Sequence, residues 1–138
     1  MNTVSPLLTD LYQLTMMQAY HDRDMHEEAS FEFFFRDFSP KRSFLVACGL
    51  EQVLDYLEQL SFSDEEIDYL RRDGRFNDRF LDYLGQLRFH GDVFAMEEGT
   101  VFFADEPVIR ITAPLPVAQL VETRIINILQ FQTMIASK

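Results

Sequence analysis

The sequence is short of several residue types, and each shortage excludes a class of protein. Cys48 is the single cysteine, so the chain forms no internal disulfide, which favours a reducing compartment such as the cytoplasm. With five glycines, it contains neither a glycine-rich phosphate loop nor a dinucleotide-binding fingerprint. No apolar run approaches the roughly 18–20 residues that span a bilayer, and no basic region precedes an apolar one at the N-terminus. We therefore expect a cytoplasmic protein without a membrane span or a secretory signal.

Positive charge is also scarce, since 12 Lys and Arg residues stand against 23 Asp and Glu residues, for a net charge of -11. A field of this sign disfavours nucleic acid and anionic membranes as partners. A local exception is the group Arg36, Lys41 and Arg42. One interpretation is a phosphate contact, because the planar guanidinium suits bidentate phosphate binding. The other, which the residues alone favour, is a solvated hairpin with ordinary surface charges.

The stretch from Leu7 to Met17 predicts a helix that is apolar nearly all round. Two stripes follow helical spacing: Leu8, Tyr12, Met16 and Ala19 form one, and Leu7, Leu11 and Leu14 form the other. We expect such a helix to lie between layers or beneath a partner. Pro6 fits its first turn, with Ser5 or Thr9 as the cap. The residues alone favour Asp10 as a first-turn dipole partner and Tyr12 as an ordinary buried aromatic.

Predicted strands and helices follow one another along the rest of the chain, which indicates an α+β fold. Period-two or short apolar runs predict strands at 29–36, 43–48, 92–96, 100–103 and 108–112. Helical spacing predicts helices at 50–58, 63–74, 77–87 and 117–138. Ser63 and Glu66 have the form of a capping box, Gly74 is placed to end that helix, and Asn77 to begin the next. Arg36 stands at the end of the first strand.

No catalytic or metal site can be assigned from the residues. The two histidines of the polar stretch 21–28, His21 and His26, lack the spacing of metal ligands and are interpreted as part of a solvated link. Cys48 stands in an apolar run and is interpreted as a core residue. The helix at 117–138 has no terminal glycine or breaker. We therefore expect a fragment, with one domain at 1–116 and the first helix of another at 117–138.

Several stretches resemble the N-terminal part of nicotinate phosphoribosyltransferase. They include PLLTDLYQ from Pro6, FEFFFR from Phe31, GLE from Gly49 and EEG from Glu97. Further on are Glu106-Pro107, QLVET from Gln119 running into Asn127, and IASK from Ile135. The resemblance runs in register along nearly the whole chain. Its first motif and its last helix are the most specific parts.

The resemblance implies a sandwich-like N-terminal α/β domain of a type II phosphoribosyltransferase, whose last helix leads into a barrel-like domain. It implies that nicotinate and phosphoribosyl pyrophosphate react to nicotinate mononucleotide and pyrophosphate through an oxocarbenium-like state. It also implies coupling to ATP hydrolysis through a phosphorylated histidine, with Mg2+ and cations on the leaving group. ATP and Mg2+ would be bound mainly outside this segment, because the histidine and the phosphoribosyl-binding loop lie beyond Lys138.

Three residues match family site positions. Tyr12 matches the tyrosine that stacks on the pyridine ring, Asp10 the acid beside it, and Arg36 a basic residue that reaches phosphate. In the family, this domain completes the active site of the neighbouring subunit of a homodimer. We therefore expect no catalytic residue here and no activity from the segment alone. The alternative is a non-catalytic interaction module derived from the same domain.

Overall fold

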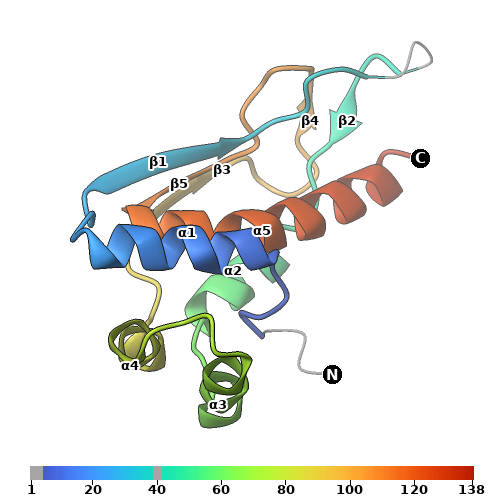
Figure 1. The fold of residues 1–138 in the computed structure, drawn as a ribbon. Helices are drawn as coiled ribbons and strands as arrows, with labels where there is room; N and C mark the ends of the chain where they lie inside the picture. The colour runs from blue at the N-terminus through green and yellow to red at the C-terminus, as the bar shows by residue number, and fades with distance from the viewer. Residues whose placement is uncertain (1–4, 39–41) are drawn as a thin grey trace.

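The computed structural model describes residues 5–38 and 42–138, and within them five helices and five strands form an α+β fold (Figure 1). This confirms the predicted fold class. The helices are α1 (Leu11–Asp22), α2 (Leu50–Glu58), α3 (Asp64–Asp73), α4 (Asp78–Gln86) and α5 (Leu115–Ala136). The strands are β1 (Glu28–Phe33), β2 (Leu45–Val46), β3 (Asp92–Ala95), β4 (Val101–Phe102) and β5 (Ile109–Pro114).

The larger sheet is antiparallel, with the order β1-β5-β3 and therefore with the last strand of the chain at its centre. Its register places Phe31 and Val93 on either side of Ile111. β2 and β4 form a separate antiparallel pair, with Leu45 opposite Phe102. Both edges of the larger sheet thus depend on β5, which the chain reaches only after residue 108.

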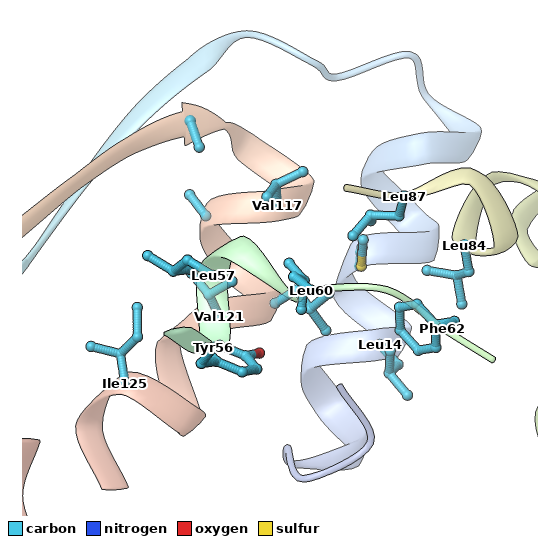
Figure 2. Packing of buried hydrophobic residues seen from close by; sticks show 14 of the residues in the cluster. Leu14, Tyr56, Leu57, Leu60, Phe62, Leu84, Leu87, Val117, Val121 and Ile125 are labelled. Atoms are coloured by element: carbon cyan, nitrogen blue, oxygen red, sulfur yellow. The ribbon is translucent and has the colours of Figure 1, made fainter. Parts of the chain in front are cut away.

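The two longest helices, α1 and α5, lie side by side beneath the sheet, and the shorter helices cover their other side (Figure 1). Figure 2 shows side chains from α1, α2, α4, α5 and the segments between them meeting in one core. Its labelled members are Leu14, Tyr56, Leu57, Leu60, Phe62, Leu84, Leu87, Val117, Val121 and Ile125. α5 supplies the largest share of this core. The helix that was predicted to begin a second domain is therefore also packed into the core of this one.

The local signals at helix ends are confirmed. The Ser63 hydroxyl accepts from the Glu66 amide while the Glu66 carboxylate accepts from the Ser63 amide, which completes the capping box of α3. Gly74 ends α3 at φ 77, in the left-handed region. Asn77 caps α4 by accepting from the Phe80 amide. These features depend on residues a few positions apart, so the sequence is sufficient to predict them.

The first helix begins later than predicted, at Leu11 rather than near Leu7. The hydroxyl of Ser5 accepts from the Leu7 amide and donates to the Glu66 carboxylate, so it holds a turn against α3 and caps no helix. The backbone of Ser5 also accepts from Leu8. The N-cap of α1 is Asp10, and its carboxylate makes no capping hydrogen bond.

Three other predicted boundaries are wrong. β1 ends at Phe33, three residues before Arg36, because the chain then leaves the ladder toward the β4–β5 link, where Phe35 accepts from the Asp105 amide. β2 is two residues long instead of six. α5 begins at Leu115 rather than Val117, because Pro116 fits the first helical turn, where its missing N–H leaves no hydrogen bond unmade.

The faces of α1 also differ from the prediction. Its buried residues are Gln13, Leu14, Met17 and His21, whereas Leu11, Tyr12 and Met16 are 48%, 51% and 37% exposed. The interpretation of Tyr12 as a buried aromatic is therefore wrong in this chain. His21 is not in a solvated link either, because its ring is buried and stacks on Tyr83 at 4.5 Å between centroids.

Candidate functional site

A polar cluster lies where the first turn of α1 meets the N-terminal half of α5. Its members are Asp10, Tyr12, Gln13, Gln119, Glu122 and Thr123. The three α5 residues are spaced by three and four positions, so they share one face of that helix. The cluster brings together Asp10 and Tyr12, two of the three residues that the resemblance singles out.

Gln13 is at the centre of this cluster, and its side chain is fully buried. Its amide nitrogen lies 3.1 Å from Glu122 Oε2, 3.1 Å from Thr123 Oγ1 and 3.2 Å from the Tyr12 hydroxyl oxygen. Its carbonyl oxygen accepts from the Gln119 amide. An NH2 group carries two hydrogens, so three acceptors share two donors. The contacts with α5 satisfy an amide that would be costly to bury unpaired.

Asp10 and Tyr12 are each tied to this centre by one hydrogen bond. The Thr123 hydroxyl donates to Asp10 Oδ2 at 3.3 Å. The Tyr12 hydroxyl accepts from Gln13 while its ring stays half exposed. A fixed hydroxyl with an open ring face is a suitable surface for stacking a planar ligand. The Asp10 carboxylate, which belongs to the same cluster, can accept hydrogen bonds or face a cationic ring.

Glu122 also lines a hollow of about 210 Å³ between α5 and the strands β1 and β5. The other lining residues are mostly apolar: Ser30, Phe31, Glu32, Phe33, Ile109, Ile111, Ala118, Val121, Ile125 and Ile126. The hollow and the polar cluster therefore adjoin at one side chain. With the carboxylates Glu32 and Glu122 and no cation in its lining, this hollow is poorly suited to phosphate.

Arg36 is exposed and follows the end of β1, in the segment toward β2. No hydrogen bond or ion pair within residues 5–38 and 42–138 joins it to Asp10 or Tyr12. Lys41, the second member of the predicted basic group, lies outside the described residues, and Arg42 is half-buried. The structure thus gathers Asp10 and Tyr12 but does not bring Arg36 to them.

Three other matched stretches, EEG, GLE and Glu106-Pro107, make hydrogen bonds that hold the fold in place. Glu98 Oε1 accepts from the amides of Gly49, Leu50 and Glu51 at 2.9, 2.6 and 3.4 Å, so the EEG and GLE motifs meet at the start of α2. A carboxylate there faces the positive end of the helix dipole. Glu106 similarly accepts from the Phe103 amide at 2.7 Å.

Burial and the neighbouring Glu98 raise the pKa of the Cys48 thiol, which disfavours a nucleophilic thiolate.

Reasoning from the sequence does not single out Gln13, Gln119, Glu122 and Thr123 as site residues. The spacing of the last three on one helical face is a usable signal, as is the position of Gln13 directly after Tyr12. Spacing alone does not predict that these two helix faces pair, because Gln13 and Gln119 are 106 residues apart.

Among the described residues, no group of three or more His, Cys, Asp or Glu side chains could hold a metal ion. None of the described helices is long and apolar enough to span a membrane.

The model of the nicotinate phosphoribosyltransferase (NAPRTase) N-terminal domain family matches residues 7–130. Over 135 residues, the chain is 47% identical to the nicotinate phosphoribosyltransferase pncB2 of Mycobacterium tuberculosis, covering 98% of this chain and 29% of the relative. Over 133 residues it is 41% identical to the nicotinate phosphoribosyltransferase of Bacillus subtilis, covering 96% and 27%. The chain therefore spans less than a third of the length of these relatives.

Solved structures show the same likeness in the fold. The crystal structure of human nicotinic acid phosphoribosyltransferase superposes with a TM-score of 0.86 at 29% identity, covering 94% of this chain and 27% of the human one. A nicotinate-nucleotide pyrophosphorylase from Pyrococcus furiosus superposes with a TM-score of 0.66 at 19% identity, which supports the fold alone. In both, the matching part is about a quarter of the longer chain.

Proposed function

The chain belongs to the nicotinate phosphoribosyltransferase N-terminal domain family, and on that premise we propose that it is the N-terminal domain of such an enzyme. The full-length enzyme transfers the phosphoribosyl group of phosphoribosyl pyrophosphate to nicotinate and releases pyrophosphate, a step of NAD biosynthesis. The ring nitrogen forms a bond to the anomeric carbon of the ribose as the bond from that carbon to pyrophosphate breaks. We place the enzyme in the cytoplasm, in keeping with the single cysteine.

The polar cluster is the observation that carries this proposal. The half-exposed ring of Tyr12, held by its hydroxyl, offers a face on which the pyridine ring stacks. Bond formation turns the neutral ring nitrogen into a cationic pyridinium nitrogen. The Asp10 carboxylate, 3.3 Å from the Thr123 hydroxyl, is a fixed negative charge that would favour this developing positive charge. An aromatic face favours the same change.

We propose further that the site is shared between the subunits of a homodimer. Several large apolar side chains along α1 and α5 remain exposed in this chain: Leu11, Tyr12, Met16, Ile126, Phe131, Met134 and Ile135. Phe131 alone is 67% exposed. Large apolar side chains left exposed along two packed helices favour burial of these helices against another subunit or domain. The Tyr12 ring would then face a neighbouring subunit that supplies the rest of the site.

Phosphate binding is assigned to the exposed Arg36, whose guanidinium suits a phosphate group of phosphoribosyl pyrophosphate. ATP and Mg2+, which the family resemblance implies, would be bound mainly by residues outside this segment. The task proposed for this segment is to bind and orient the two substrates.

The test is steady-state kinetics of the full-length enzyme with Tyr12→Ala and Arg36→Ala. We expect the first change to lower kcat/KM for nicotinate and the second to lower it for phosphoribosyl pyrophosphate, each by roughly tenfold or more, the loss of one good contact. Tyr69→Ala and Arg72→Ala, both on the exposed side of α3, are matched controls. Unchanged kinetics of both site variants would refute these roles. A full-length chain without activity would favour the interaction module instead.

A further inference from the structure

We propose that Gln13 and Thr123 are positioning residues, which set the ring of Tyr12 and the carboxylate of Asp10 relative to each other. This inference rests on the proposed function, because it assigns a task to residues that touch no substrate themselves. Asp10 and Tyr12 lie at the exposed start of α1, where neither is held by core packing. The Asp10 carboxylate accepts a hydrogen bond directly from Thr123 of α5. The Tyr12 hydroxyl accepts one from Gln13, which in turn bonds to Thr123.

The Gln13 amide has one orientation in this arrangement, and Glu122 determines it. Glu122 Oε2 accepts from Gln13 Nε2 at 3.1 Å and from Gln119 Nε2 at 2.9 Å. Both amide NH2 groups therefore point toward the carboxylate, and the Gln13 carbonyl is left to face Gln119. With its nitrogen on the Tyr12 side, Gln13 donates to the phenol oxygen and orients the ring.

Thr123 has the corresponding role for Asp10. Its hydroxyl lies 3.1 Å from the Gln13 amide nitrogen and 3.3 Å from Asp10 Oδ2, so it accepts from one and donates to the other. A hydroxyl is well suited to this relay, because it offers both a donor and acceptor lone pairs. Asp10 makes no capping hydrogen bond to α1, so the Thr123 hydroxyl is the contact that restrains its carboxylate.

The test uses the full-length enzyme with Thr123→Val, Thr123→Ser, Gln13→Leu and, at the exposed end of α4, Gln86→Leu as the matched control. Val has nearly the shape of Thr without the hydroxyl, whereas Ser keeps the hydroxyl. We expect Thr123→Val and Gln13→Leu to raise KM for nicotinate roughly tenfold, as for one lost hydrogen bond to a charged or site group. KM for phosphoribosyl pyrophosphate should stay within about twofold, and Thr123→Ser should retain wild-type KM values.

A stability measurement separates positioning from folding. The melting temperature of each variant is measured first, and the assays are run well below it. A loss of folded protein lowers the concentration of active enzyme, and it would therefore lower the apparent kcat and leave both KM values unchanged. That result, or an equal rise of both KM values, would overturn the positioning role.

The two proposals fail in different ways. If Tyr12→Ala and Asp10→Asn leave the nicotinate KM unchanged, the proposed site itself is wrong, and the positioning inference fails with it. If those variants raise the KM while Thr123→Val and Gln13→Leu do not, only the positioning inference is overturned. If Thr123→Ser fails to restore the KM of Thr123→Val, the hydroxyl is not the group that acts.

Discussion

Replacing Gly49 by Ala tests how the start of α2 is fitted against α5. Gly49 has φ +110, a backbone conformation that L side chains rarely adopt. A β-carbon there would lie 3.1 Å from Gln132 Cβ, 3.2 Å from Gln132 Cγ and 3.4 Å from Ile128 Cγ2. Backbone strain at such a position costs about 1–3 kcal/mol. Because Gln132 Cβ belongs to a packed helix, crowding adds about 1 kcal/mol more.

We therefore expect Gly49→Ala to lower the free energy of unfolding of the 138-residue chain by about 2–4 kcal/mol. Two other glycines separate the causes. Gly74 has φ +77 but open space around its β-carbon position, so Gly74→Ala should cost only the strain, about 1 kcal/mol. Gly85 lies within α4 with neither strain nor crowding, so Gly85→Ala should stabilise the chain by about 0.5–1 kcal/mol.

The assay is urea unfolding followed by far-ultraviolet circular dichroism, with the midpoint read at constant m-value. The expected order of stability is Gly85→Ala, wild type, Gly74→Ala and then Gly49→Ala. If Gly49→Ala is no less stable than Gly74→Ala, the contact with α5 does not constrain this position. If Gly85→Ala destabilises the chain, the helix at that point is not as described.

Three further outcomes are expected. Burial, with a smaller contribution from Arg79, lowers the pKa of His21, so the unfolded chain binds a proton that the folded one does not. Stability should therefore fall as pH drops below about 6.5, and His21→Phe should flatten the dependence of the urea midpoint between pH 7.5 and 5; an unchanged slope would contradict this. Glu98→Gln should lower the free energy of unfolding by about 1–2 kcal/mol, because it weakens three charge-assisted hydrogen bonds at the start of α2. The control in the same urea assay is Glu97→Gln at an exposed position, which should stay within about 0.5 kcal/mol of wild type. Isothermal titration of the 138-residue chain with nicotinate should show no saturable binding, because the site proposed here needs residues outside this segment. A well-behaved monomer that binds would refute that proposal.

Interactions between near neighbours in the chain could be predicted from the sequence, and those between distant segments could not. The capping box of Ser63 and Glu66 and the Asn77 cap depend on three-residue spacings, and both are present. β2 is only two residues long because its extent is set by pairing with β4, more than fifty positions later. Strand length is a property of the pair rather than of either strand.

In the candidate site too, the residues of one sequence motif could be predicted, whereas their contacts with a distant helix could not. Asp10 and Tyr12 are singled out by their motif, and they lie in one cluster. The burial of Gln13 was not predicted, because a polar residue on an apolar helix is normally assigned to the solvent side. Its partners come from α5, and helical spacing alone does not determine which helix a polar face contacts. Arg36 stays a prediction, because its contact would involve atoms outside this segment.

The long separation between α1 and α5 also has a consequence for synthesis of the protein. Gln13 and Gln119 are 106 residues apart. At roughly 5–20 residues per second, the ribosome adds the second about 5–20 s after the first. During that interval the nascent chain has neither its central strand nor the partners of its buried amide. The buried amide of the first helix therefore has no partner from α5 until translation has passed Thr123.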